Sequence, residues 1–242
     1  MLGTSMVSSL RFSIPTSLAK IYSQMIVLDV ETTNCNPEFD RITELAALCI
    51  GSDGVDFSMD EYVQLPDDIE IDPEVEKITG LTREFLAMKG LPESEVARRF
   101  ALMLRISGPI LFVIHNAQFD LSFLRNMFNR YGYFFPQKYG VIDTLTVFKD
   151  RFPYPHKLSD AILYYKIDNV ENTHQAMDDV MALCAVFSEM NLEKDDLADY
   201  VNLFGYHPKY GYIGEKIPGI VYSPQDFNSP IRLPDIIKIR DL

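Results

Sequence analysis

Residues 109–120 read PILFVIHNAQFD, and this stretch decides the fold. The apolar run at its start predicts a short buried strand. Residues 117–131 then carry apolar side chains at helical spacing, namely Phe119, Phe123, Leu124, Met127 and Phe128. A buried strand that passes directly into a helix is typical of α/β proteins. The same stretch places one acid, Asp120, in the first turn of the predicted helix.

The flanking sequence predicts a mixed sheet with helices on its faces. Residues 25–30 form a second apolar run and predict another buried strand. Residues 42–50 and 58–65 predict two further strands, which the GSDG turn between them would join as an antiparallel pair. Residues 74–106 are helical in pattern but interrupted by Gly80, Gly90 and Pro92. The remaining predicted elements are a short strand at 141–142 and helices at 144–148, 157–165 and 176–190.

The chain divides into three parts by composition. Residues 1–24 contain no Asp or Glu and resemble a targeting peptide only weakly, so we interpret them as a flexible arm or as sequence upstream of a start at Met25. Residues 25–190 carry the α/β pattern. Residues 191–242 form a C-terminal extension in which 192–204 could add a helix. The remainder is rich in Tyr, Pro and Gly, so we expect it to wrap the main domain or form a small hairpin.

Composition restricts the classes of function. The net charge is −13, which argues against a protein that coats long nucleic acid by bulk electrostatics but allows a site that holds a few nucleotides. No apolar run is long enough to span a membrane. Cys35, Cys49 and Cys184 form no CxxC pair, which favours a reduced, cytoplasmic protein without a zinc site. Cys49 and Cys184 lie in apolar runs and are predicted core residues.

Four acids and one histidine form the candidate site. Asp29 and Glu31 stand two apart at the end of the first predicted strand, so their side chains face the same side. Asp120 and Asp179 lie in early helical turns. Converging carboxylates resist ionisation, and two divalent cations would offset that cost. The pattern therefore favours a two-metal site that hydrolyses phosphodiesters.

The segment HQAMDD at 174–179 offers a proton acceptor and two competing acids. His174 precedes a predicted helix and is suited to take a proton near neutral pH. Asp178 and Asp179 differ by about 100° around that helix, so only one of them should face the site. Taken singly, each of these residues has an ordinary structural explanation, such as the preference of an acid for a helix N-terminus.

The segments together resemble the DEDDh 3′–5′ exonucleases, the RNase H-like family that includes the epsilon subunit of bacterial DNA polymerase III. The similarity covers roughly residues 25–190 and rests on VLDVETT, DRITELAAL, HNAQFDLSFL, IDTL, KLSD and HQAMDDVMAL. The segment KITGLT departs from it, because Thr79 stands where the family often has histidine. The family spacing H-x(4)-D selects His174 and Asp179 over Asp178.

The resemblance implies an RNase H-like fold with a mixed five-stranded sheet, followed by the C-terminal extension. It implies that Asp29, Glu31, Asp120 and Asp179 bind two Mg²⁺ or Mn²⁺ ions, and that His174 accepts the proton of the attacking water. Nucleoside 5′-monophosphates would leave from 3′ ends of single-stranded or frayed DNA. Asp143 of IDTL would support the site, and Thr32, Thr33, Asn116 and Phe119 would contact substrate, although the helical spacing of Phe119 also fits a core residue.

Two other functions stay open at this point. The first is a 3′–5′ exoribonuclease, since discrimination between the sugars depends on contacts near the 2′ position that the sequence does not place. The second is a non-catalytic module that binds a DNA polymerase or replisome. A degenerate module would be expected to lose an acid or the histidine, and all five residues are present.

Overall fold

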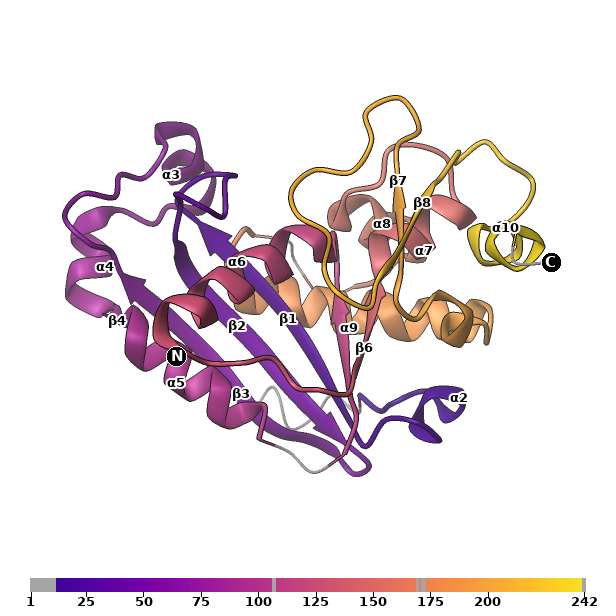
Figure 1. The fold of residues 1–242 in the computed structure, drawn as a ribbon, viewed down its shortest axis with the longest axis horizontal. Helices are drawn as coiled ribbons and strands as arrows, with labels where there is room; N and C mark the ends of the chain where they lie inside the picture. Colours follow the sequence, from indigo (N-terminus) through magenta and orange to yellow (C-terminus); the bar gives the residue numbers. More distant parts are fainter. Residues whose placement is uncertain (1–11, 106–107, 169, 171–172, 241–242) are drawn as a thin grey trace.

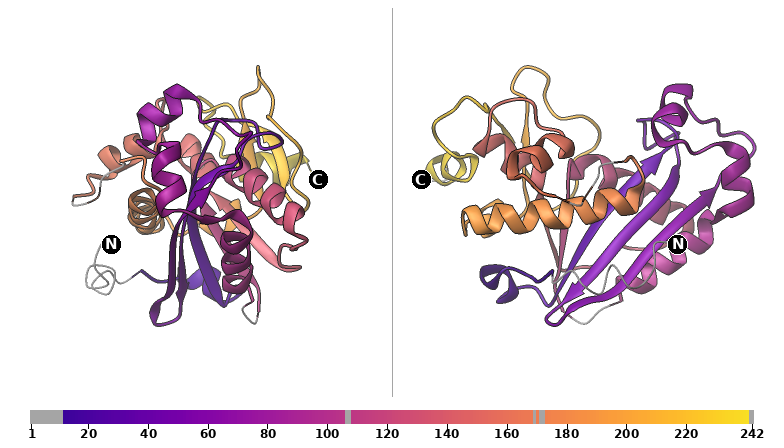
Figure 2. Two further views of the ribbon diagram at one scale, coloured as in Figure 1. Left: turned by 90° about the vertical axis from the view of Figure 1, so that its left-hand side faces the viewer. Right: turned by 180° about the vertical axis from the view of Figure 1, so that it is seen from behind.

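A six-stranded mixed sheet forms the centre of the protein, and helices cover both of its faces (Figures 1 and 2). The structure is a computed structural model that describes residues 12–240 apart from 106–107, 169 and 171–172. The strand order is β4-β3-β2-β1-β5-β6. The strands are β1 (Gln24–Thr32), β2 (Ile42–Gly51), β3 (Gly54–Gln64), β4 (Leu91–Pro92), β5 (Ile110–Ile114) and β6 (Tyr139–Asp143).

The helices lie on the two faces of this sheet and at its ends (Figure 1). They are α2 (Thr16–Ala19), α3 (Pro73–Thr79), α4 (Arg83–Lys89), α5 (Glu93–Met103), α6 (Ala117–Tyr131), α7 (Thr144–Arg151), α8 (Leu158–Tyr165), α9 (Ala176–Glu193) and α10 (Leu233–Arg240). A 3₁₀ turn, η1 (Leu197–Tyr200), follows α9, and two further strands, β7 (Leu203–Tyr206) and β8 (Val221–Pro224), pair with each other.

The alternation of side chains along β1 divides the core into two clusters. Met25 and Val27 pack with α7, α8 and α9 on one face, whereas Ile26 and Leu28 pack with α5 and α6 on the other. All ten residues of β2 are buried, which fits a central strand covered on both faces. Cys49 and Cys184 are buried core residues, as the sequence predicted, and Cys35 is exposed.

The direction of three neighbouring strands positions the candidate site. β5 pairs parallel with both β1 and β6, so the carboxyl ends of all three strands meet at one edge of the sheet. Ligand sites of open α/β sheets lie outside such an edge. α6 starts directly after β5, and α9 packs across β1 and β2 (Figure 2).

The structure corrects two expectations at the edges of the fold. The sheet has a sixth strand, the two-residue β4, because the break at Gly90 and Pro92 lets the chain run briefly beside β3. Residues 12–24 are not a flexible arm, since Leu18 is fully buried in the core. Residues 1–11 lie outside the described residues.

The extension also differs from the expectation of a helix followed by a hairpin. No separate α-helix forms within 192–204, where α9 ends, the short η1 follows and β7 begins. The strands β7 and β8 run parallel, which requires the long connection between them. The extension does wrap the main domain, because Tyr200, Phe204 and Ile217 are buried against it. No helix within the described ranges is long and apolar enough to cross a membrane.

Candidate active site

A cavity of about 660 Å³ opens at the carboxyl ends of β1, β5 and β6. All five predicted catalytic residues line it, namely Asp29, Glu31, Asp120, His174 and Asp179. They come from β1, from the first turn of α6 and from the entry and first turns of α9. The structure thus brings together in one cavity side chains that are up to 150 residues apart in the sequence.

Asp29 and Glu31 project from the last residues of β1. Their cross-strand partners in β2 are Ala46 and Glu44, and the register shifts immediately after Glu31. This irregularity ends the regular pairing at the point where the chain must leave the sheet. Glu44 is almost fully buried and accepts a hydrogen bond from the Ala176 amide at 3.1 Å. That bond fixes the first turn of α9 against the strand that pairs with β1.

Asp120 is held by β1, the strand that carries Asp29 and Glu31. Its Oδ1 accepts a hydrogen bond of 3.1 Å from the Val30 amide, and the residue is 2% exposed. Val30 lies between Asp29 and Glu31 in the chain. The bond therefore sets the distance between α6 and the end of β1.

Asp143 supports the entry to α6. Asn116 at the helix N-cap has a left-handed backbone (φ 70°) and makes no side-chain capping bond. Asp143 caps the helix instead, because its Oδ1 accepts from the amides of Asn116 at 2.9 Å and Ala117 at 3.3 Å. Its Oδ2 accepts from the Thr146 hydroxyl at 2.7 Å. The carboxylate thus joins β6, α6 and α7 just behind the acids.

Asp178 and Asp179 point in different directions. Asp179 is 5% exposed and lines the cavity, whereas Asp178 accepts a hydrogen bond of 2.7 Å from the Thr173 hydroxyl and is not part of the lining. Ligand atoms of Glu31, His174 and Asp179 all lie within 4.8 Å of one another. The geometry therefore agrees with the selection of Asp179 by the motif spacing.

The acids raise one another's pKa. Burial is the largest cause for Asp29, whose pKa lies well above its ordinary value, and the charges of Asp120, Asp179 and Glu31 raise it further. Burial and the charge of Asp179 raise the pKa of Glu31 to about 8. The pKa of Asp120 is also raised well above its ordinary value by burial, although two backbone N–H groups oppose this. The four carboxylates therefore lack enough nearby positive charge to offset their mutual repulsion.

The residues present fit divalent cations of the hard, oxygen-preferring kind. The carboxylates of Asp29, Glu31, Asp120 and Asp179 line one cavity, and Mg²⁺ and Mn²⁺ favour carboxylates and water. A cation at this position would favour the ionised carboxylates and lower the raised pKa values. His174 is near enough to Glu31 and Asp179 to serve either as a ligand or as a proton acceptor.

The four predicted substrate contacts divide into two pairs. Asn116 and Phe119 line the cavity, and Phe119 also packs against the core beside Phe123, with ring centroids 4.9 Å apart. Thr32 and Thr33 are buried and do not line it. The Thr32 hydroxyl donates to the Asn34 carbonyl at 2.7 Å, and the Thr33 hydroxyl accepts from the Arg41 amide at 3.0 Å. Both threonines therefore shape the turn after β1.

Further residues of the cavity lining, called the far wall below, were not named as site residues from the sequence. The far wall carries the side chains of Lys149, Tyr154, His156, Lys157, His207, Gln225 and Phe227. Lys157 belongs to the KLSD segment, so motif spacing alone could have indicated it. His207, Gln225 and Phe227 come from the extension, where no periodicity or motif marks them.

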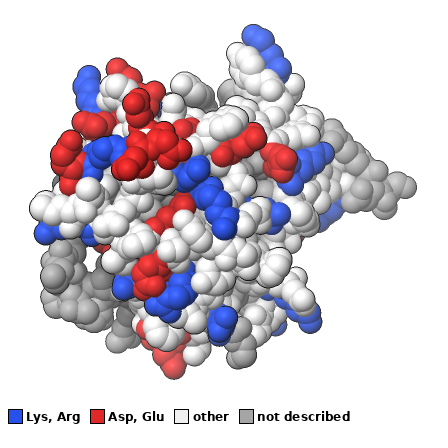
Figure 3. All heavy atoms as spheres, turned by 60° about the vertical axis from the view of Figure 1, so that its left-hand side comes forward, with Lys and Arg blue, Asp and Glu red and all other residues white. Residues whose placement is uncertain are grey.

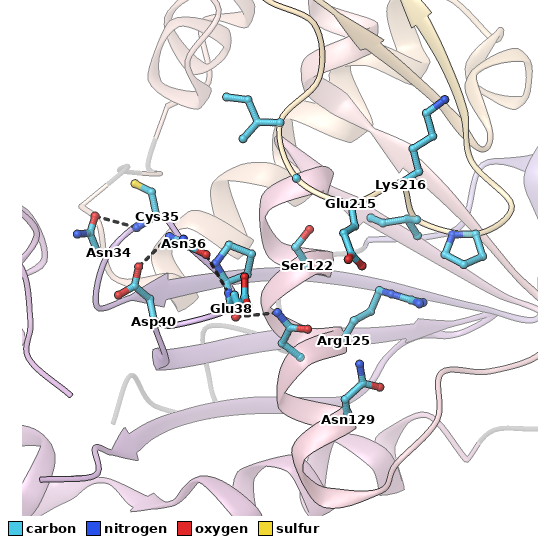
Figure 4. Close-up of a pocket in the computed structure, with 16 residues that line it drawn as sticks. Asn34, Cys35, Asn36, Glu38, Asp40, Ser122, Arg125, Asn129, Glu215 and Lys216 are labelled. Atoms are coloured by element: carbon cyan, nitrogen blue, oxygen red, sulfur yellow. Dashed lines mark hydrogen bonds between the residues drawn. The ribbon is translucent and has the colours of Figure 1, made fainter. Parts of the chain in front are cut away.

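A separate groove of about 830 Å³ lies outside this cavity, between residues 34–40, α6 and residues 213–218 (Figure 4). The Asn126 side chain donates a hydrogen bond of 2.7 Å to the Pro37 carbonyl and joins two sides of the groove. None of the five candidate catalytic residues lines it.

Comparison with known proteins places this site in a family. The family model described as "Exonuclease" matches residues 26–187, which include all five candidate catalytic residues. The chain belongs to the exonuclease family. This assignment confirms the resemblance to the DEDDh exonucleases and the RNase H-like α/β fold.

Individual relatives of this exonuclease domain are larger proteins. The PolC-type DNA polymerase III of Halalkalibacterium halodurans is 33% identical over 166 residues, which are 66% of this chain and 11% of the relative. Exonuclease DPD1, chloroplastic/mitochondrial, of Arabidopsis thaliana is 28% identical over 191 residues, or 73% of this chain and 59% of the relative. The chain therefore spans less than two thirds of each of these proteins.

A solved structure with the same fold is a complex with single-stranded DNA. The zinc-bound complex of E. coli exonuclease I with single-stranded DNA superposes with a TM-score of 0.64 and 25% sequence identity. The alignment covers 74% of this chain and 42% of exonuclease I.

Proposed function

We propose that this protein is a metal-dependent 3′–5′ exonuclease that removes nucleotides from single-stranded or frayed 3′ ends of DNA and releases nucleoside 5′-monophosphates. One observation carries the proposal: the four acids and the histidine of the family pattern line a single cavity. Membership of the exonuclease family and the similarity to exonuclease DPD1 support the reaction class.

Each of the five residues has a role that follows from its position. The four carboxylates hold two divalent cations, Mg²⁺ or Mn²⁺, which when bound neutralise developing charge on the phosphate and favour ionisation of water. His174, at the rim of the cavity and close to Glu31 and Asp179, accepts the proton of the attacking water. Asp120 and Asp143 keep α6 in register with β1, so that all four acids converge.

The terminal nucleotide lies on the α6 side of the cavity. Asn116 offers an exposed amide at the helix N-cap, and Phe119 offers the part of its ring that faces the cavity. Thr32 and Thr33 contribute by holding the turn after β1. The net charge of −13 is compatible with a binding site that holds only a few nucleotides. On the face shown in Figure 3, acidic side chains gather near the top and basic ones are scattered over the rest.

A DNA substrate is favoured over RNA by the relatives. The matching PolC-type protein is a DNA polymerase III, and the matching E. coli structure contains single-stranded DNA. The PolC-type relative also supports a polymerase as a partner of this chain. An exoribonuclease is the second candidate, and direct comparison of the two sugars decides between them.

The test is a product ladder on matched 5′-labelled single-stranded DNA and RNA, with Mg²⁺, Mn²⁺ or EDTA. We expect a metal-dependent ladder that shortens from the 3′ end on DNA and is lost in Asp29→Ala. Asp178→Ala is the matched control, because it removes a neighbouring acid that is outside the cavity lining. Preference for RNA would favour the second candidate. Absence of cleavage of either strand by the folded, metal-loaded protein would refute both and favour a non-catalytic module.

A further inference from the structure

The extension after residue 190 forms one wall of the active-site cavity. His207, Gln225 and Phe227 line this cavity together with the acids of β1, α6 and α9. Tyr154 and His156, from the connection between α7 and α8, complete the wall. The family match ends at residue 187, so these extension residues are additional to the five that the family pattern supplies.

Buried hydrogen bonds fix this wall to the catalytic domain. The Gln225 side chain is 2% exposed and donates to the Thr146 carbonyl at 2.8 Å and to Asp150 Oδ1 at 2.7 Å. The Gly205 amide donates to the Thr146 hydroxyl at 2.9 Å. Because Gln225 is anchored on α7, Phe227 two residues later has a defined position at the cavity.

The wall presents a group of aromatic rings. The Phe227 ring lies 5.3 Å from the His156 ring at an interplanar angle of 66°, and 6.3 Å from the His207 ring. Tyr154 meets His156 edge-on at 5.9 Å and is 76% exposed. Tyr154 is exposed and Phe227 is partly exposed, so these two rings present surface to a flat ligand, whereas His156 is buried behind them. Nucleobases stack on such rings without regard to sequence.

Two lysines on the same side provide positive charge. Lys149 and Lys157 line the cavity, and burial lowers the pKa of Lys149. Across the described ranges no carboxylate lies within ion-pair distance of either ammonium group. Two unpaired cations next to aromatic rings match the phosphates and bases of one strand.

The separate groove of Figure 4 is less suited to a strand. Its cations, Arg125 and Lys216, share the groove with the carboxylates of Glu38, Asp40 and Glu215. The Lys216 ammonium lies over the Tyr212 and Tyr222 rings, at 5.0 Å and 5.6 Å from their centroids. The excess of acids would repel a phosphate backbone.

We propose that the extension is a binding wall for the single strand on the 5′ side of the scissile phosphodiester. Phe227 stacks on a base of that upstream strand, together with Tyr154 or His207, and Lys149 contacts its phosphates. This assignment rests on the proposed function, which places the terminal nucleotide on the α6 side of the same cavity. It makes the extension the part of the chain that binds upstream nucleotides.

The first test measures binding without turnover. In an Asp29→Asn background, which keeps the strand intact, fluorescence anisotropy gives the Kd for 5′-fluorescein-labelled dT12. We expect Phe227→Ala to raise this Kd about tenfold, the scale of one lost base–aromatic stack. Phe134→Ala, which truncates a 90% exposed phenylalanine outside the cavity, is the matched control and should change Kd less than about twofold. Phe227→Trp should restore binding.

The second test separates upstream binding from chemistry. Thymidine 5′-(4-nitrophenyl phosphate) has a terminal nucleotide but no upstream base, so Phe227→Ala in the otherwise wild-type enzyme should hydrolyse it normally while its KM for dT12 rises. Lys149→Gln should lower the slope of log Kd against log salt by about 0.7, the value for one lost phosphate contact on a single strand.

The outcomes distinguish this inference from the proposed function. An unchanged Kd in Phe227→Ala, or full binding by Phe227→Leu, would overturn the stacking wall. Equal losses on dT12 and on the nitrophenyl ester would also overturn it, because the side chain would then act on the reaction centre. Failure of the wild-type protein to hydrolyse either substrate would refute the proposed exonuclease activity. The comparison of Kd values would still show whether Phe227 binds the single strand.

Discussion

Removal of divalent cations should make the stability of the protein depend on pH in an unusual direction. The pKa of Glu31 rises from 4.5 to about 8 in the folded state, mainly through burial. Between these two pH values the unfolded chain has released a proton that the folded chain still holds. Folding stability of the cation-free protein therefore falls as pH rises from about 4.5 to about 8.

The size of the effect follows from the same shift. One pKa unit corresponds to about 1.4 kcal/mol, and Glu31 is partly exposed, so screening reduces the penalty to the order of 2 kcal/mol for this residue alone. Asp29 and Asp120 shift in the same direction and add to it. Bound Mg²⁺ stabilises the ionised site, so its stabilising effect should increase with pH over the same interval.

Urea unfolding at pH 5 and pH 8, in EDTA and in Mg²⁺, measures both the pH dependence of the cation-free protein's stability and the stabilisation by Mg²⁺. We expect Mg²⁺ to raise the free energy of unfolding more at pH 8 than at pH 5. Glu31→Gln should make the EDTA-treated protein more stable at pH 8 and reduce the gain from Mg²⁺. Asp178→Asn, which alters an acid outside the cavity lining, should do neither. A gain from Mg²⁺ that is equal at both pH values, or a destabilised Glu31→Gln protein, would refute the reasoning.

Three further predictions concern single residues of the site. Asp179→Ala should nearly abolish hydrolysis of single-stranded DNA, whereas Asp178→Ala should have a mild effect; equal losses in the two variants would break the assignment of Asp179 to the cavity. His174→Ala should slow turnover by roughly 10²–10⁴ in single-turnover assays, the range for a lost general base. Its Mg²⁺ affinity, measured by calorimetry, should stay close to that of the wild type, and a large loss of affinity would make His174 a ligand. Asp143→Ala should lower the free energy of unfolding by about 3 kcal/mol in urea titrations, because it leaves buried donors on Ala117 and Thr146 without an acceptor. An unchanged midpoint would show that water replaces the carboxylate.

Sequence reasoning located the candidate site because its signals are local. Asp29 and Glu31 stand at a strand end, and Asp120 and Asp179 stand in first helical turns. Strand and helix periodicity predicted that these side chains could face one site, and the resemblance to the exonuclease family selected them as a set. The choice of Asp179 over Asp178 needed only the 100° step of a helix and the family spacing. Cys49 and Cys184 were placed in the core from their apolar surroundings alone.

The far wall could not be predicted because its signals are not local. Phe227 reaches the cavity through the anchoring of Gln225 on α7, a contact across about 75 residues of sequence. The parallel pairing of β7 and β8 is invisible in a segment without periodicity. Thr32 and Thr33 were predicted as substrate contacts from their place in the motif, but their hydroxyls close the turn after β1 by internal hydrogen bonds.

The anchoring of the extension on α7 has a consequence for shortening the chain. A truncated version that stops near residue 190 would keep every residue of the family pattern. It would, however, remove Tyr200, Phe204 and Ile217, which would uncover the apolar core against which they pack, and it would leave Asp150 without the Gln225 amide and the Leu233 N–H. We therefore expect a chain cut at the boundary that sequence similarity suggests to be less stable than one that retains the contacts up to Leu233.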